Sequence, residues 1–153
     1  MAHRFYPTGW PAWKQVPQFV PVPTRGRRDG WTAARQAIFI GVLAETGSVA
    51  CAARAAGPSR ESAYRLRRRT DAGSFVHAWD AVLAMRDGRE VASRKFTAEE
   101  LALAAFDAPI AVRMHTGRFM GAWRKPSFSI MMRMLARIDN AIGRSRGMER
   151  GAV

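Results

Sequence analysis

The sequence contains few of the residues from which disulfides and metal sites are built. It has one cysteine, Cys51, and three widely spaced histidines, His3, His77 and His115. A single cysteine excludes an internal disulfide, and in its alanine-rich surroundings Cys51 is expected to be a small buried residue. The scattered histidines do not supply the ligand set of a zinc site. We therefore expect no bound metal.

Catalytic and phosphate-binding patterns are missing as well. No glycine-rich loop of the Walker type occurs, so ATP hydrolysis is not expected. The adjacent Glu99 and Glu100 are explained by the start of a helix, which argues against a metal-dependent nuclease centre. The sequence thus predicts a protein that is not an enzyme and needs no cofactor.

Long apolar runs are also lacking. No stretch approaches the roughly 20 apolar residues that a membrane-spanning helix requires. The first residues, MAHRFYPTGWPAW, lack the basic and then apolar layout of a secretory signal. We therefore expect no membrane partner and a location in a bacterial cytoplasm, associated with the nucleoid.

Positive charge is what the sequence has in excess. Lysine and arginine total 25 against 12 aspartate and glutamate residues, which gives a net charge of +13 at pH 7. Such an excess repels itself unless it meets a polyanion, and nucleic acid is the commonest one. The composition therefore favours a nucleic-acid partner.

The clearest pattern lies between residues 48 and 69, in the sequence SVACAARAAGPSRESAYRLRRR. Ser48 can cap a first helix of small residues, and Gly57 supplies the backbone freedom that a sharp turn needs. Ser59 can then cap a second helix over residues 60–69. Ordinary helical hairpins share this pattern, but the charge of the chain favours a helix-turn-helix that binds DNA.

The segment LAETGSVACAARAAGPSRESAYRLRRR, residues 43–69, resembles the helix-turn-helix segment of a family of small bacterial and phage proteins. These proteins have a homeodomain-like fold, and some are phage terminase small subunits. The resemblance covers residues 31–84 and continues more loosely to about residue 140. Pro58 departs from it, because such turns usually carry an aliphatic residue there. The resemblance implies a protein that binds double-stranded DNA.

The second helix of this motif is expected to lie in the major groove, with its first turn nearest the bases. Arg60 and Arg65 are the candidates for base reading, because one guanidinium can hold both acceptors of a guanine. The three successive arginines at the end of the helix are expected to contact phosphates. Ser59 and Tyr64 can contact phosphate or base. Glu61 can accept a hydrogen bond from a cytosine amino group or orient an arginine. The predicted DNA-binding residues are Ser59, Arg60, Glu61, Tyr64, Arg65, Arg67, Arg68 and Arg69.

Residues 1–29 are rich in proline and interleave aromatic with basic residues. Because each proline removes an N–H and restricts the residue before it, we expect a mobile arm without regular helix. Packing of this arm on the domain or on a partner is the alternative. Accessory DNA contacts, like those of homeodomain arms in the minor groove, are expected from Arg25, Arg27 and Arg28.

Further helices complete a domain over residues 30–94. Thr32 can cap a helix over residues 33–45, whose apolar face forms the floor of the core. A fourth helix follows the arginine run, and its apolar residues recur at steps of three and four, so it closes the core from the other side. These apolar residues are Phe75, Ala78, Trp79, Val82 and Met85.

Residues 95–142 are expected to form a packing or oligomerisation unit. Thr97 and Glu100 have the spacing of a capping box, which predicts a helix to about Phe106. Alternating residues on both sides of a Thr116–Gly117 turn then predict a β-hairpin. This hairpin is either a DNA-contacting wing or an element for packing or dimerisation.

A last helix is predicted over residues 128–142, capped by Ser127 and ended by Gly143. Its methionine-rich apolar face is expected to be core, and residues 143–153 are expected to be a tail. The predicted fold is thus mainly α: a helix-turn-helix domain of three to four helices, then a helix, a small β-hairpin and a C-terminal helix.

Three functions fit these patterns. The first is a sequence-specific transcription regulator, dimeric because one short helix reads too few base pairs to be selective. The second is a phage or prophage terminase small subunit, which would recognise packaging DNA as a ring. The third is a basic adaptor that binds RNA or an anionic membrane through its aromatic arm. The first is the preferred interpretation.

Overall fold

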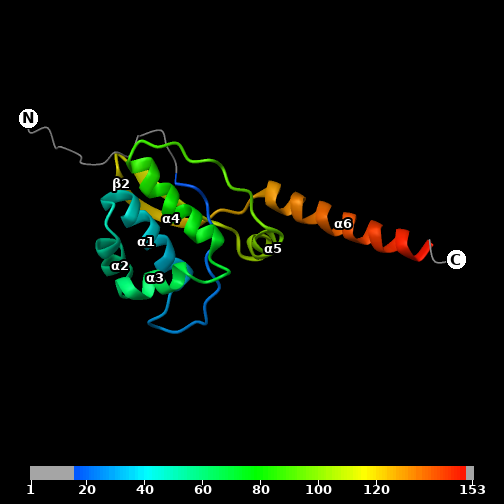
Figure 1. Cartoon of the computed structure of the whole chain (residues 1–153), viewed down its shortest axis with the longest axis horizontal. Coiled ribbons are helices and arrows are strands. Elements are labelled where there is room, and N and C mark those ends of the chain that lie inside the picture. The colour runs from blue at the N-terminus through cyan, green and yellow to red at the C-terminus, as the bar shows by residue number, and fades with distance from the viewer. Residues whose placement is uncertain (1–15, 151–153) are drawn as a thin grey trace, which may run out of the picture.

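The computed structural model describes the backbone of residues 16–150 and the side chains of residues 16–145. This described part is mainly helical with one small antiparallel hairpin, as the sequence predicts (Figure 1). In chain order the elements are α1 (Ala33–Thr46), α2 (Val49–Ala56), α3 (Arg60–Arg67), α4 (Gly73–Arg86), α5 (Ala98–Asp107), β1 (Ile110–His115), β2 (Arg118–Arg124) and α6 (Phe128–Arg150).

α1 is the central element of the fold. α2 and α4 pack against it, and both strands of the hairpin lie on it. Phe39 of α1 is fully buried and meets the rings of Trp31, Phe75 and Trp79 at centroid distances of 5.5, 5.9 and 4.6 Å. Aromatic side chains bury large areas, so this cluster forms the centre of the core.

Polar residues cap the helices where the sequence predicts them. The hydroxyls of Thr32, Ser48 and Ser59 each accept a hydrogen bond from the backbone N–H three residues further on. Thr97 and Glu100 form both bonds of a capping box. Because these caps satisfy N–H groups that have no partner inside the helix, they fix where α1, α2, α3 and α5 begin.

The first described residues, 16–22, pack into the core, which corrects the prediction of a mobile arm for this part of the chain. Phe19 is fully buried, its ring lies 5.9 Å from that of Phe75, and its backbone pairs with Ile110 of β1. Three N–H groups of the segment find acceptors: Phe19 N bonds the Ile110 carbonyl, Val20 N the Ser74 hydroxyl and Val22 N the Gln36 side-chain oxygen. Pro17 and Pro21 have no N–H to satisfy, so burial of the segment leaves fewer donors to pair. Residues 1–15 of the predicted arm lie outside the described part.

The hairpin shares the core of α1 to α4, so it packs on the domain that was predicted for residues 30–94. Its turn lies at Thr116 and Gly117, which both have positive φ, 48° and 77°. The ring of Phe119 in β2 packs directly on Gly41 of α1, where a side chain would leave no room for it. The Glu45 carboxylate accepts a hydrogen bond of 3.0 Å from the Phe119 N–H. The hairpin is therefore a packing element of α1.

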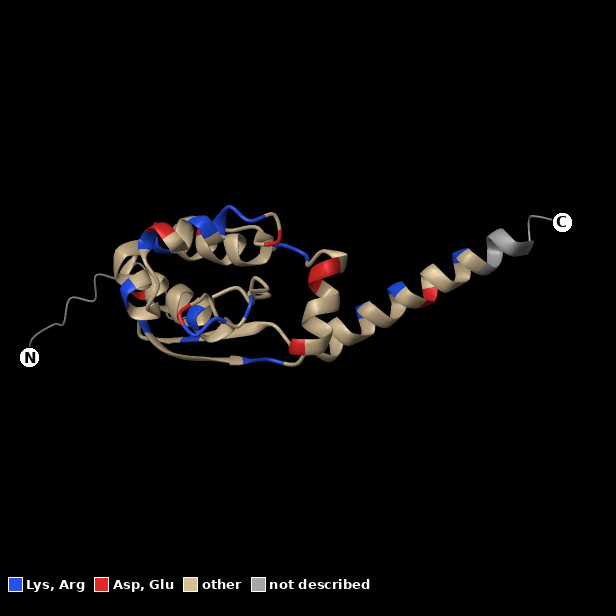
Figure 2. Ribbon diagram, turned by 90° about the horizontal axis from the view of Figure 1, so that it is seen from below, with Lys and Arg blue, Asp and Glu red and all other residues tan. Residues whose placement is uncertain are grey.

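α5 and the first turn of α6 form a second, smaller apolar cluster. Its buried residues are Val20, Leu101, Ala104 and Ile130. Beyond this cluster α6 projects from the body of the molecule as a single rod (Figures 1 and 2). The helix continues through Gly143 to Arg150, so the predicted tail from residue 143 is wrong. A glycine costs a helix only about 1 kcal/mol. The apolar face of α6, predicted to be core, is largely exposed.

Candidate nucleic-acid interface

α2 and α3 are two short helices joined by a sharp turn at Gly57. The turn has φ 106° at this residue, a conformation that glycine adopts readily. Its N–H bonds the Ala53 carbonyl at 2.9 Å, and the Ser59 hydroxyl then caps α3 by accepting from Ser62 N. α2 packs on α1 through buried alanines. Cys51 lies off that face and is exposed, so the prediction that it is buried is wrong.

α3 is anchored along one face. Ala63 and Leu66 are buried in the core, and Ser62 is half-buried beside them. The helix ends at Arg67, slightly before the predicted Arg69. The predicted binding residues that are exposed on or beside α3 are Ser59, Arg60, Glu61, Tyr64, Arg65, Arg68 and Arg69.

Two of the predicted binding residues also pack against α4. The ring of Tyr64 lies 5.5 Å from that of Trp79, although 43% of the tyrosine remains exposed. The Arg67 guanidinium lies 5.1 Å from the centre of the Trp79 ring and forms an ion pair of 2.8 Å with Asp80. Arg67 therefore fastens α3 to α4, and only Tyr64 keeps a substantial exposed surface.

The remaining arginines of the run differ in their partners. Arg69 follows the helix and holds the Asp71 carboxylate with two bonds of 2.9 and 2.6 Å. Within the described part of the chain, Arg60, Arg65 and Arg68 form no such ion pair. Their guanidinium groups are therefore available to an external anion.

Glu61 lies between these arginines in the first turn of α3. A hydrogen bond with its own backbone N–H, a second with the Ser59 side chain, and the charges of Arg60 and Arg65 hold the pKa of Glu61 below its usual value. Its carboxylate is thus ionised at neutral pH. It can orient the two arginines or accept from a base amino group.

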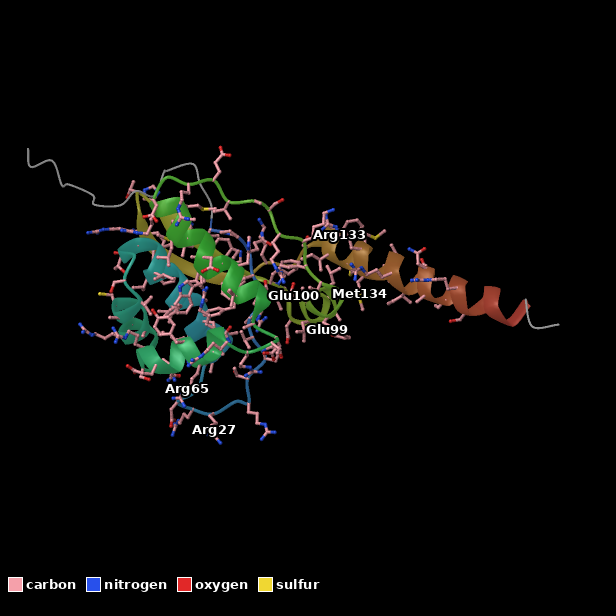
Figure 3. The ribbon with its side chains drawn as sticks, in the orientation of Figure 1. Arg27, Arg65, Glu99, Glu100, Arg133 and Met134 are labelled. Atoms are coloured by element: carbon pink, nitrogen blue, oxygen red, sulfur yellow. The ribbon has the colours of Figure 1, made fainter. Side chains whose placement is uncertain are left out.

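A basic loop, residues 23–30, lies beside α3. The Trp31 indole N–H donates to the Ser62 hydroxyl of α3 at 2.7 Å, and this bond fixes the end of the loop against the helix. Arg25, Arg27 and Arg28 are exposed on this loop. Figure 3 shows Arg27 and Arg65 at the same edge of the molecule. The structure thus brings the predicted accessory arginines next to the predicted reading helix.

Sequence reasoning missed Gln36, which positions this loop. Its amide is fully buried: the oxygen accepts from Val22 N at 2.8 Å, and the nitrogen donates to the carbonyls of Val22 and Trp31 at 3.0 Å each. Val22 and Trp31 flank the loop, so one side chain holds both of its ends. A polar residue among the apolar residues of α1 was the available signal.

We call the exposed arginines of the loop and of α3 the basic surface: Arg25, Arg27, Arg28, Arg60, Arg65 and Arg68. The same two segments carry only two exposed carboxylates, Asp29 and Glu61. Like charges repel, so six guanidinium groups on one surface are stabilised when an anion lies across them.

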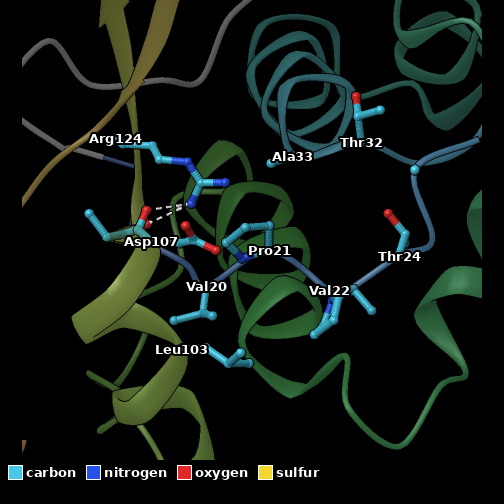
Figure 4. A pocket seen from close by; sticks show the side chains of 12 residues that line it. Val20, Pro21, Val22, Thr24, Thr32, Ala33, Leu103, Asp107 and Arg124 are labelled. Carbon is cyan, nitrogen blue, oxygen red and sulfur yellow. Dashed lines mark hydrogen bonds between the residues drawn. The ribbon is translucent and has the colours of Figure 1, made fainter. Parts of the chain in front are cut away.

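Other parts of the described chain offer less to a ligand. An open pocket of about 360 Å³ lies between residues 20–24, α1 and α5 (Figure 4). Arg124 at its rim already donates to the Asp107 and Ala108 carbonyls at the end of α5. Among the described residues, no group of His, Cys, Asp and Glu is arranged to hold a metal ion. None of the described helices combines the length and apolar character needed to cross a bilayer.

No family model matches this chain, and comparisons with curated proteins and with solved structures found no match either. The functional interpretation therefore depends on the geometry and charge of the chain itself.

Proposed function

We propose that this chain binds double-stranded DNA through a helix-turn-helix formed by α2 and α3, and that it acts as a sequence-specific transcription regulator. The observation that carries the proposal is the basic surface, in which unpaired arginines of α3 lie next to those of the loop. α3 is supported on one face and exposed on the other, which is the arrangement that a helix in the major groove requires. The serine-capped helices on either side of the Gly57 turn support the same interpretation.

In this proposal the contacts divide into two kinds. Arg60 and Arg65 read bases from the major groove, with Glu61 between them as orienting group or acceptor. Arg68 and the exposed edge of Tyr64 contact the phosphate backbone, which positions α3 without reading sequence. The loop arginines reach the neighbouring minor groove or its phosphates. Arg67 and Arg69 contribute mainly to the fold, since both already hold carboxylates.

The test is DNA selected from a random pool, followed by binding measurements on the native chain and on Arg60→Ala with Arg65→Ala. Each lost bidentate contact is expected to cost about 1–3 kcal/mol, and discrimination between the selected site and a scrambled site should fall with it. Arg133→Ala with Arg137→Ala removes the same charge from α6 and serves as the matched control. It should keep the discrimination.

Two results would contradict the proposal. Equal losses in both double variants would indicate attraction to any polyanion. Loss of nucleic-acid binding on removal of residues 1–15, with binding intact in the Arg60 and Arg65 variant, would favour the basic adaptor. Removal of residues 1–29 does not serve as a test, because it also removes the buried Phe19.

A further inference from the structure

α6 carries a row of large apolar side chains that the described part of the chain does not cover. Ile130 is 6% exposed and holds the first turn against α5. By contrast, the row formed by Phe128, Met131, Leu135, Ile138 and Ile142 is 72, 49, 49, 42 and 48% exposed. We call these five residues the α6 seam. A row of this length on a projecting helix marks an interaction surface.

The spacing of the α6 seam identifies the kind of partner. Its residues follow one another at steps of three, four, three and four, a period of 3.5 residues. Side chains at this period stay in line when two helices wrap around each other, because each inserts between residues of the facing helix. The seam therefore fits another helix of the same period better than a flat surface.

The described basic side chains of α6 lie away from the seam, and the acidic Asp139 borders it. At about 100° per residue, Arg133, Arg137 and Arg144 all fall on the opposite side of the helix. Two copies of a chain with a net charge of +13 can therefore bring their seams together without placing these arginines against one another. A helix lying on an anionic membrane would instead carry its basic residues along the borders of the apolar face.

The length of α6 also calls for a partner. It has 23 residues, of which only the first turn packs on the body of the molecule. A lone helix gains little stability in water from its own hydrogen bonds, and Gly143 weakens this one further. Burial of an apolar face is the usual source of helix stability, and here the seam is the face available for it.

We propose that this chain self-associates through the α6 seam, with α6 of a second copy as the occupant. The chain itself supplies a helix of matching period, length and uncharged seam. This inference goes beyond the DNA-binding proposal and does not depend on it, because the contact uses none of the residues of the basic surface.

The test is the mass of the full chain in solution, measured by light scattering after size exclusion over a range of micromolar concentrations, without DNA. The measured mass of the native chain should be twice the monomer mass of 17.0 kDa, or a higher whole multiple of it. Leu135→Glu with Ile138→Glu should give the monomer. Ala136→Glu with Asn140→Glu adds the same charge on the other side of α6 and should keep the native mass.

Two outcomes would overturn the proposal: a native chain that is monomeric throughout, or a seam variant that keeps the native mass. Binding of monomers to anionic vesicles through the same residues would show that lipid is the occupant, and would overturn it too. The shift of tryptophan fluorescence on unfolding, to which the buried Trp31 and Trp79 contribute, reports whether each variant is folded. Should the charged variant unfold, Leu135→Ala with Ile138→Ala replaces it and should weaken self-association about tenfold or more.

Discussion

At the scale of single residues, Gln36 and Glu100 show how buried polar groups hold loops of this protein in place. Gln36 bonds the Val22 N–H and the carbonyls of Val22 and Trp31, and without it the two Val22 groups would lose these partners at a cost of about 1–3 kcal/mol each. The Trp31 carbonyl would keep the Thr24 hydroxyl as a donor. Glu100 holds the Arg94 guanidinium with two bonds of 2.6 and 2.7 Å. Both residues therefore contribute to the arrangement of the fold and not to the basic surface.

Glu100 gives a prediction about pH. Burial alone raises the pKa of its carboxyl, but bonds from Arg94 and Thr97 N together with the Arg94 charge outweigh burial and hold the pKa below 4.5. As pH falls, the unfolded chain then binds the proton before the folded chain does, so this stabilisation is present above pH 4.5 and is lost below it. Glu100→Gln should be about 1.5–3 kcal/mol less stable at neutral pH, because a charged hydrogen bond is lost.

The difference in free energy of unfolding between the native chain and Glu100→Gln should become smaller as pH falls below 4.5. Urea unfolding at several pH values measures this difference. Glu99→Gln, the same change at an exposed neighbour, is the control and should track the native chain. If the loss of stability in Glu100→Gln stays constant down to low pH, the stabilisation by ionised Glu100 would be contradicted.

The candidate site was predictable in its residue types but not in their partners. Arg60 and Arg65 are exposed as the helical spacing of residues 60–69 predicts. The same spacing could not show that Arg67 would meet Asp80, because that contact depends on how α4 crosses α3. The packing of Tyr64 on Trp79 has the same origin.

At the scale of elements, the contact between α1 and the hairpin depends on Gly41. An added β-carbon there would lie 2.2 Å from the Cδ2 atom of Phe119, far inside normal contact distance. Gly41→Ala should therefore push the hairpin from α1 and lower the free energy of unfolding by about 1–3 kcal/mol. Chemical denaturation measures this loss.

The matched change is Gly143→Ala, because a β-carbon at that helical glycine meets nothing within 4 Å. It should leave stability unchanged or raise it, since alanine favours helix more than glycine does. If Gly41→Ala and Gly143→Ala have the same free energy of unfolding, the hairpin does not pack closely on α1.

Helix starts and the hairpin were predictable because local chemistry decides them. A hydroxyl can cap a helix, and Thr116–Gly117 can turn a chain, whatever lies elsewhere in the molecule. The burial of residues 16–22 was not predictable in this way. Their partners on β1, α1 and α4 are distant in sequence, and prolines hide the periodicity that would indicate a buried strand.

At the scale of the whole molecule, the distribution of charge predicts how DNA binding depends on salt. If Arg68 and the three loop arginines of the basic surface each neutralise a phosphate, affinity should fall about a hundredfold between 50 and 200 mM salt, because bound counterions are released. Arg25→Ala with Arg28→Ala should reduce the slope of log affinity against log salt by about two. This slope is measured by fluorescence anisotropy of labelled DNA at four or five salt concentrations.

The α6 variant Arg133→Ala with Arg137→Ala removes the same charge far from the basic surface and should leave that slope unchanged. A slope that drops equally in both variants would place the phosphate contacts over the whole molecule. The surface defined here would then have no special role.

The position of Phe19 has a consequence for how this protein can be divided. Composition suggests a boundary near Gly30, yet an excised fragment beginning there would leave a hole beside Phe75 and expose the edge of β1. Such a piece is expected to aggregate. The smallest autonomous unit must begin no later than Val16.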